Sequence, residues 1–140
     1  MAANYAGDLK PADAWAKLES DASVHLIDVR TQAEWNFVGV PDLSGIGRDV
    51  HFIQWQKFPS GLVNTEFVEE VKDKIADPKT PILFLCRSGG RSAAAAAAMT
   101  DAGYVNCFNV AEGFEGDKDG TGHRSTLGGW RFAGLPWNQG

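Results

Sequence analysis

The stretch from residue 81 to residue 99, PILFLCRSGGRSAAAAAAM, limits the fold more than any other part of the chain. It opens with a short apolar run behind a proline, which is typical of a buried central strand. Two adjacent glycines then let the backbone turn tightly. The alanine-rich half that follows favours a helix. We therefore expect a strand that leads through a tight loop into a helix.

Cys86 stands where the expected strand ends and the glycine turn begins. A sulfur at this place faces backbone N–H groups and the N-terminal end of a helix, and both favour thiolate over thiol. Arg87 and Arg91 add positive charge around the same point. A cysteine in an apolar strand is usually a small core residue. At the end of a strand and at the start of a glycine turn that holds two arginines, it instead indicates a reactive sulfur.

Strands and helices alternate along the rest of the chain. Apolar runs predict further strands at residues 24–29, 50–53 and 105–110. Helices are expected from Pro11, after Thr31 and around residues 67–75. Such alternation implies a parallel sheet with helices on both faces, and ligands then bind beyond the carboxyl ends of the strands.

The short helix after Thr31 carries a local signature at its start. Glu34 follows Thr31 at the spacing of a capping box. Trp35 and Phe37 would then face the core. Arg30 and Glu34 are four positions apart at the helix start, and we expect them to pair.

Composition and charge exclude several classes of protein. The chain has 140 residues and a net charge of −5, so a nucleic-acid partner is not expected. No secretory signal and no apolar run of membrane-spanning length stand out, so no membrane association is expected. The two cysteines, Cys86 and Cys107, make no disulfide framework, which points to a reducing, cytoplasmic location. Two cysteines and three scattered histidines fit no zinc spacing, so we expect neither a metal nor a cofactor.

The segment from Cys86 to Arg91 resembles the active loop of the rhodanese-like (thiosulfate) sulfurtransferase family. Two other parts of the chain also resemble that family. They are Asp28-Val29-Arg30 with Glu34-Trp35, and Gly128-Gly129-Trp130 with Gly134-Leu135-Pro136. The resemblance runs from about residue 9 to residue 137. It implies a single rhodanese-like α/β domain over residues 1–140, with a central, mainly parallel five-stranded sheet and helices on both faces. Residues 112–127 look like a loop insertion near the active site.

The resemblance also implies an enzyme, a sulfurtransferase of the thiosulfate:cyanide type. Sulfane sulfur would pass from a donor such as thiosulfate or a persulfide, through a persulfide on Cys86, to a thiol, to cyanide or to a protein acceptor. The expected donor-binding residues are Arg87, Ser88, Gly89, Gly90 and Arg91. Asp28, Arg30 and Glu34 are expected to be structural residues near the site.

Other interpretations remain open at this point. The protein could be a persulfide carrier or a protein-interaction module with little turnover of small molecules. A cysteine phosphatase or arsenate reductase is disfavoured, because those enzymes place one more residue between cysteine and arginine than the loop from Cys86 to Arg91 has. His123 and Arg124 could reach the site and help bind an anion. Cys107 could relay sulfur only if it lies close to Cys86, and otherwise it is a buried, inert thiol.

Overall fold

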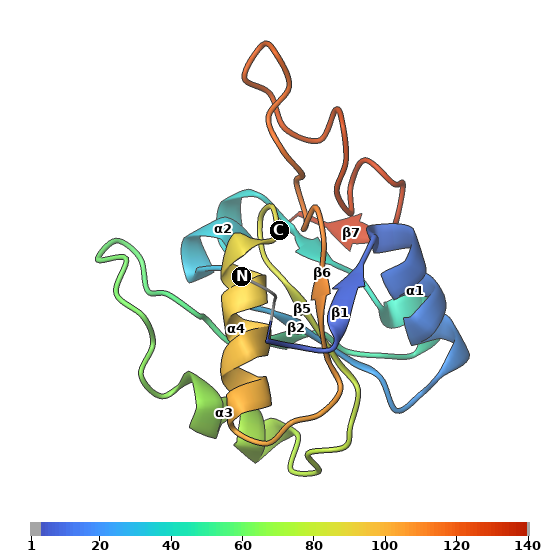
Figure 1. Cartoon of the computed structure of the whole chain (residues 1–140). Coiled ribbons are helices and arrows are strands. Elements are labelled where there is room, and N and C mark those ends of the chain that lie inside the picture. The colour runs from blue at the N-terminus through green and yellow to red at the C-terminus, as the bar shows by residue number, and fades with distance from the viewer. Residues whose placement is uncertain (1–3, 140) are drawn as a thin grey trace.

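The computed structural model describes residues 4–139, which form a parallel sheet between two layers of helices (Figure 1). The helices are α1 (Pro11–Ser20), α2 (Gln32–Phe37), α3 (Phe67–Lys74) and α4 (Gly90–Asp101), with a short 3₁₀ helix at Ser44–Ile46. The strands are β1 (Gly7–Leu9), β2 (His25–Asp28), β3 (Val40–Pro41), β4 (His51–Phe52), β5 (Ile82–Leu85), β6 (Cys107–Val110) and β7 (Trp137–Asn138).

The main sheet has five strands in the order β1-β6-β5-β2-β4, and all of its pairings are parallel. Its centre is β5, where all four residues are buried, as the apolar run after Pro81 predicts. Phe84 of β5 pairs with Ile27 of β2 on one side and with Asn109 of β6 on the other. A separate antiparallel pair joins β3 to β7.

Each face of the sheet is covered by a different helical layer (Figure 1). On one face, Phe67 and Val71 of α3 pack with Ala95 and Ala96 of α4. The small alanine side chains let α4 lie close to the strands. On the other face, Leu18 of α1 packs with residues of the closing segment, which include Trp130. The expected α/β sheet with helices on both faces is therefore confirmed.

The carboxyl ends of the strands lie at one edge of the sheet, together with α2, β7 and the long loop before β7 (Figure 1). The helix α2 begins as its sequence predicts, because the Thr31 hydroxyl accepts the Glu34 N–H while the Glu34 carboxylate accepts the Thr31 N–H. This capping box fixes the direction in which α2 leaves β2. Glu34 is thereby placed at the edge where β5 also ends.

Some details differ from the sequence-based expectations. The short strand β1 was not anticipated, because residues 7–9 form an edge strand without an apolar run. Residues 105–110 do not hold the last strand, since β7 follows near the end of the chain. The prediction that Phe37 faces the core is wrong: its side chain is 78% exposed, since α2 is only six residues long and ends there. Within residues 4–139, no helix is both long enough and apolar enough to cross a membrane.

We expect Trp130→Ala to destabilise the fold strongly. The Trp130 side chain is fully buried, meets Trp15 edge-on and donates its indole N–H to the Pro136 carbonyl at 2.7 Å. Truncation of a buried aromatic side chain costs about 3–5 kcal/mol. Urea denaturation of the variant will measure this loss. The matched control is Phe37→Ala, whose free energy of unfolding should stay within about 0.5 kcal/mol of the parent value.

Candidate active site

Cys86 follows β5 directly and lies at the start of a tight loop that leads into α4. Its sulfur accepts the Gly89 N–H at 3.1 Å, and the Ser92 hydroxyl oxygen lies 3.2 Å from it. Gly89 adopts a φ of 113°, in the left-handed region that a side chain disfavours, and this conformation aims its N–H back at the sulfur. Cys86 is only 1% exposed. The sulfur therefore sits at the base of the loop, in contact with a backbone donor and a hydroxyl group.

The segment after β6 holds the base of this loop in place. The Phe114 N–H donates to the Cys86 carbonyl at 2.8 Å, and the Glu115 N–H donates to the Arg87 carbonyl at 2.9 Å. Gly113 makes this approach possible, because a Cβ atom at that position would lie 2.5 Å from the Cys86 carbonyl oxygen. The residues that form the loop and the residues that hold it in place are thus separated along the chain by α4 and β6.

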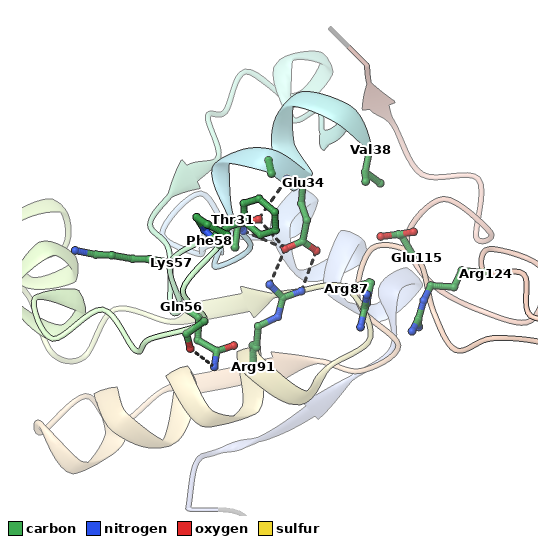
Figure 2. Close-up of a pocket in the computed structure, with 13 residues that line it drawn as sticks. Thr31, Glu34, Val38, Gln56, Lys57, Phe58, Arg87, Arg91, Glu115 and Arg124 are labelled. Carbon is green, nitrogen blue, oxygen red and sulfur yellow. Dashed lines mark hydrogen bonds and ion pairs between the residues drawn. The ribbon is translucent and has the colours of Figure 1, made fainter.

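Glu34 and Arg91 form an ion pair across the site (Figure 2). Two hydrogen bonds join the carboxylate to the guanidinium, at 2.6 and 2.9 Å. Burial by itself raises the pKa of Glu34, but the Arg91 hydrogen bonds and charge, with the Thr31 N–H, outweigh it and lower that pKa from 4.5 to about 2. The expected pairing of Glu34 with Arg30 is wrong, because Arg30 turns into the core and Arg91 reaches across from α4.

Asp28 and Arg30 form a second ion pair, which is fully buried beside the loop. Arg30 donates to both Asp28 carboxylate oxygens, with a shortest distance of 2.7 Å, and also to the Gly39 carbonyl at 2.7 Å. Its guanidinium lies 4.3 Å from the centre of the Phe114 ring. Both side chains have zero exposure. This environment suits the structural role expected for Asp28 and Arg30 from the sequence.

A cavity of about 610 Å³ opens beside the loop (Figure 2). Three of its cationic side chains, Lys57, Arg87 and Arg124, have no acidic side chain within 4 Å among residues 4–139. The carboxylates in its lining are already engaged, Glu34 with Arg91 and Glu115 with Arg131. The cavity therefore presents unpaired positive charge, which suits an anion. The rest of its lining is Thr31, Ala33, Val38, Gln56, Phe58, Pro59 and Gly61.

The loop of residues 115–126 contributes one of the two residues considered from the sequence. Arg124 lines the cavity and donates to the Gly116 carbonyl at 2.6 Å. His123 does not line it and is held within its own loop, where its N–H donates to the Asp119 carboxylate at 3.0 Å. No group of three or more potential metal-ligating side chains occurs in the part of the chain that the structure describes.

Cys107 lies away from Cys86 on the neighbouring strand. It pairs with Ile82, which is four positions before Cys86 on β5. At about 3.3 Å per residue, this offset separates the two cysteines by roughly 13 Å along the sheet. Cys107 is fully buried, and burial raises the pKa of its thiol to about 11. Direct sulfur transfer between the two cysteines is therefore excluded in this conformation.

Three residues that touch the site were not predicted from the sequence: Ser92, Asn109 and Gly113. The Ser92 hydroxyl contacts both the Cys86 sulfur and the Asn109 side chain, at 3.2 and 2.5 Å. A serine in the first turn of the helix is a sequence signal for such a contact, because its side chain points back toward the preceding loop. Asn109 gives a weaker sequence signal, because it is a polar residue within an apolar strand. Nothing in the local sequence around Gly113 singles it out from the other glycines.

Comparisons with known proteins find relatives in sequence and in fold. The crystal structure of Rv0390 from M. tuberculosis has 48% sequence identity and a TM-score of 0.90, and the match covers 97% of this chain and 99% of that one. An uncharacterised protein of Rickettsia conorii is 40% identical over 124 residues, which are 89% of this chain and 90% of that protein. The chloroplastic rhodanese-like domain-containing protein 4 of Arabidopsis thaliana is 26% identical over 130 residues, which cover 89% of this chain and 24% of that protein. The solution structure of the polysulfide-sulfur transferase homodimer of Wolinella succinogenes shares the fold, with 21% identity, a TM-score of 0.62, and coverage of 95% of this chain and 78% of that one.

A parallel α/β sheet with a cysteine loop at its carboxyl edge is the arrangement of the rhodanese-like proteins, and this chain is one of them. A family model described as the STR4 middle domain matches residues 7–140. The chain belongs to that family.

We expect Glu34→Gln to remove a pH-dependent part of the stability. The pKa of Glu34 is about 2 in the folded protein, below its ordinary 4.5, so the ionised pair stabilises the fold above about pH 4.5 and this stabilisation is lost as the pH falls toward 2. Glutamine keeps the capping box but not the charge. The free energy of unfolding of the variant should be about 2 kcal/mol lower than that of the parent at pH 6. This difference should shrink as the pH is lowered.

Chemical denaturation of both proteins at several pH values between 6 and 2.5 will measure this difference. Other carboxylates with lowered pKa values, such as Asp21 and Asp42, titrate in both proteins and cancel in the comparison. A difference that stays constant over the whole pH range would contradict the expectation.

Proposed function

We propose that this protein is a sulfurtransferase that carries sulfane sulfur as a persulfide on Cys86. The observation that carries the proposal is the contact of the Cys86 sulfur with the Gly89 N–H, at the base of a loop beside a cationic cavity. A backbone donor stabilises negative charge on sulfur without a partner base. The fold, which known sulfurtransferases share, supports the same chemistry.

The reaction has two steps of nucleophilic displacement. First, the Cys86 thiolate attacks the outer sulfur of a donor such as thiosulfate; a new S–S bond forms, the donor's S–S bond breaks, and the electron pair leaves with sulfite. Second, an acceptor thiolate or cyanide attacks the terminal sulfur of the persulfide, and Cys86 leaves as a thiolate. No external oxidant or reductant enters the cycle. The 1% exposure of Cys86 favours donors whose terminal sulfur projects from a narrow group.

The anionic end of the donor would bind in the cavity. Arg87 is exposed at its wall and has no acidic partner within 4 Å among residues 4–139, so its charge is available. We infer a smaller role in donor binding for Arg91, because Glu34 neutralises its charge and fixes its side chain. We assign donor binding chiefly to Arg87, with Lys57 and Arg124 further along the cavity. We also infer a reducing, cytoplasmic setting, in which the two free cysteines would persist.

A persulfide carrier for a protein acceptor is the second candidate. Phe58 lines the cavity and is 68% exposed, and Leu62, four positions further along the same loop, is 69% exposed. An exposed apolar loop that reaches the cavity offers a packing surface to a protein partner. In this case turnover with small acceptors is slow, whereas loading of Cys86 is unchanged.

Incubation with thiosulfate should add the mass of one sulfur atom to the protein, and cyanide should remove it. The added sulfur should be absent from Cys86→Ser and present in Cys107→Ser, because the Cys86 sulfur accepts a backbone N–H beside the cavity, whereas Cys107 is fully buried and burial raises the pKa of its thiol to about 11. Intact-mass spectrometry of the three proteins will test this.

Two outcomes of that experiment would count against the proposal. A gain of sulfur that survives in Cys86→Ser would move the chemistry to another residue. Failure of thiosulfate and of low-molecular-weight persulfides alike to load Cys86 would refute sulfur transfer through this cysteine.

We expect Arg87→Ala to weaken donor binding. Loss of one charge-assisted contact should raise the KM for thiosulfate about tenfold, with a smaller effect on kcat. Steady-state kinetics with cyanide as the acceptor will measure both constants. The matched control is Lys79→Ala, which removes the same charge just before β5, at the opposite end of that strand from Cys86, and should leave the KM unchanged. Equal effects of the two substitutions would mean that only overall charge matters.

A further inference from the structure

A line of hydrogen-bonded side chains runs from the Cys86 sulfur to the N-terminal strand. The Ser92 hydroxyl oxygen lies 3.2 Å from the sulfur and 2.5 Å from Oδ1 of Asn109. Nδ2 of Asn109 donates to the Asp8 carboxylate at 3.0 Å, and that same carboxylate oxygen accepts the Tyr5 hydroxyl at 2.8 Å. Ser92 is fully buried and Asn109 is 5% exposed. Residues from α4, β6 and β1 therefore share one polar network with the cysteine.

The chemistry of the end groups fixes the direction of each bond. An ionised Asp8 carboxylate can only accept, so the Asn109 amide must turn its NH₂ group toward Asp8. Its carbonyl oxygen then faces Ser92, and it can only accept as well. The Ser92 hydroxyl has a single proton, and the 2.5 Å contact with that carbonyl engages it. What Ser92 then offers to the sulfur is a lone pair.

A lone pair on the Ser92 oxygen can accept a hydrogen bond from the Cys86 S–H group, but it repels the negative charge of a Cys86 thiolate. While Cys86 is a thiol, its proton can point at the Ser92 oxygen, and every polar group in the line is satisfied. When Cys86 ionises and its proton passes to water, the Ser92 proton can turn to the sulfur only by leaving the buried Asn109 carbonyl without a donor. Buried acceptors without a donor are costly.

We propose that Asn109, oriented by Asp8, is a positioning residue that holds the Ser92 proton away from the Cys86 sulfur and so restrains ionisation of the resting cysteine. The Gly89 N–H remains the donor that favours the thiolate. The balance between these two contacts sets how readily the sulfur attacks a donor. This inference concerns the cysteine that the proposed function uses, but its test does not depend on sulfur transfer.

Other charged groups around the loop lie outside this hydrogen-bonded network. Arg91 on α4 is paired with Glu34 of α2, and Arg30 after β2 is paired with Asp28. Arg87, next in the chain, is exposed. None of these side chains hydrogen-bonds to Ser92 or Asn109 among the described residues, so substitutions in the network leave them in place.

The first test is Asn109→Leu, which keeps the approximate size of the side chain and changes no charge. Removal of the carbonyl frees the Ser92 proton for the sulfur. The rate of Cys86 alkylation by iodoacetamide, followed against pH by peptide mass spectrometry, should then reach half its maximum at a lower pH. Release of one hydrogen bond corresponds to a roughly fivefold larger acid dissociation constant. A merely structural role predicts no shift, or a shift to higher pH.

The second test acts from the protein surface and remains valid if Asn109→Leu does not fold. Asp8 is exposed on the edge strand β1. Asp8→Leu removes the acceptor that orients the Asn109 amide, while Asp8→Asn removes the same charge and keeps an acceptor oxygen. The alkylation profile should therefore move to lower pH by more in Asp8→Leu than in Asp8→Asn. Equal shifts would mean that only the charge of Asp8 matters, and would overturn the proposal.

The third test repeats the substitutions in a Ser92→Ala background. Without the hydroxyl, neither Asn109→Leu nor Asp8→Leu has a proton to release, and the excess shift should vanish. A shift of Asn109→Leu, or an excess shift of Asp8→Leu over Asp8→Asn, that persists in this background overturns the proposal. Because alkylation reports the thiol itself, these results stand whether or not thiosulfate loads Cys86, so failure of the proposed function can be told from failure of this inference.

Discussion

The arrangement of the site depends on one buried cation, the Arg30 guanidinium. It neutralises Asp28 at the end of β2, donates to the Gly39 carbonyl after α2, and stacks on the Phe114 ring. The backbone of Phe114 in turn binds the Cys86 carbonyl. Three separate parts of the chain therefore meet at a charge that cannot be left without its partners, since an uncompensated charge in a protein interior is strongly destabilising. Arg30 acts on the cysteine loop only through these neighbours.

The parts of the fold that could be predicted from the sequence are those set by local patterns. The apolar run of β5, the glycine turn and the alanine helix follow one another directly, so the position of Cys86 at the carboxyl edge required no knowledge of distant contacts. The same holds for the Thr31–Glu34 capping box, which lies within a single turn. Alternation of strands and helices was sufficient for the parallel sheet, because such connections have few workable topologies.

The parts that could not be predicted depend on which strands become neighbours. Glu34 pairs with Arg91, 57 positions away, and Asp8 accepts a hydrogen bond from Asn109, 101 positions away. No local sequence pattern predicts either contact. The strand β1 is only three residues long, so its place at the sheet edge next to β6 is visible only once the register is known. Position 113 requires glycine because a Cβ atom there would lie 2.5 Å from the Cys86 carbonyl oxygen. The position of Cys86 follows from local sequence patterns, whereas most of its surroundings are set by tertiary contacts.

The bracing of the cysteine loop by the segment after β6 has a consequence for how the protein matures. Chains emerge from the ribosome with the N-terminal end first, and domains fold as their residues become available. Cys86 is synthesised well before Gly113 and Phe114, so a nascent chain carries this cysteine without the hydrogen bonds that shape its loop. In newly made chains the cysteine loop thus lacks these contacts, which arise only when β6 joins the sheet beside β5 and the segment after it reaches the loop. The hydrogen-bonded surroundings of Cys86 are in this sense a late product of folding.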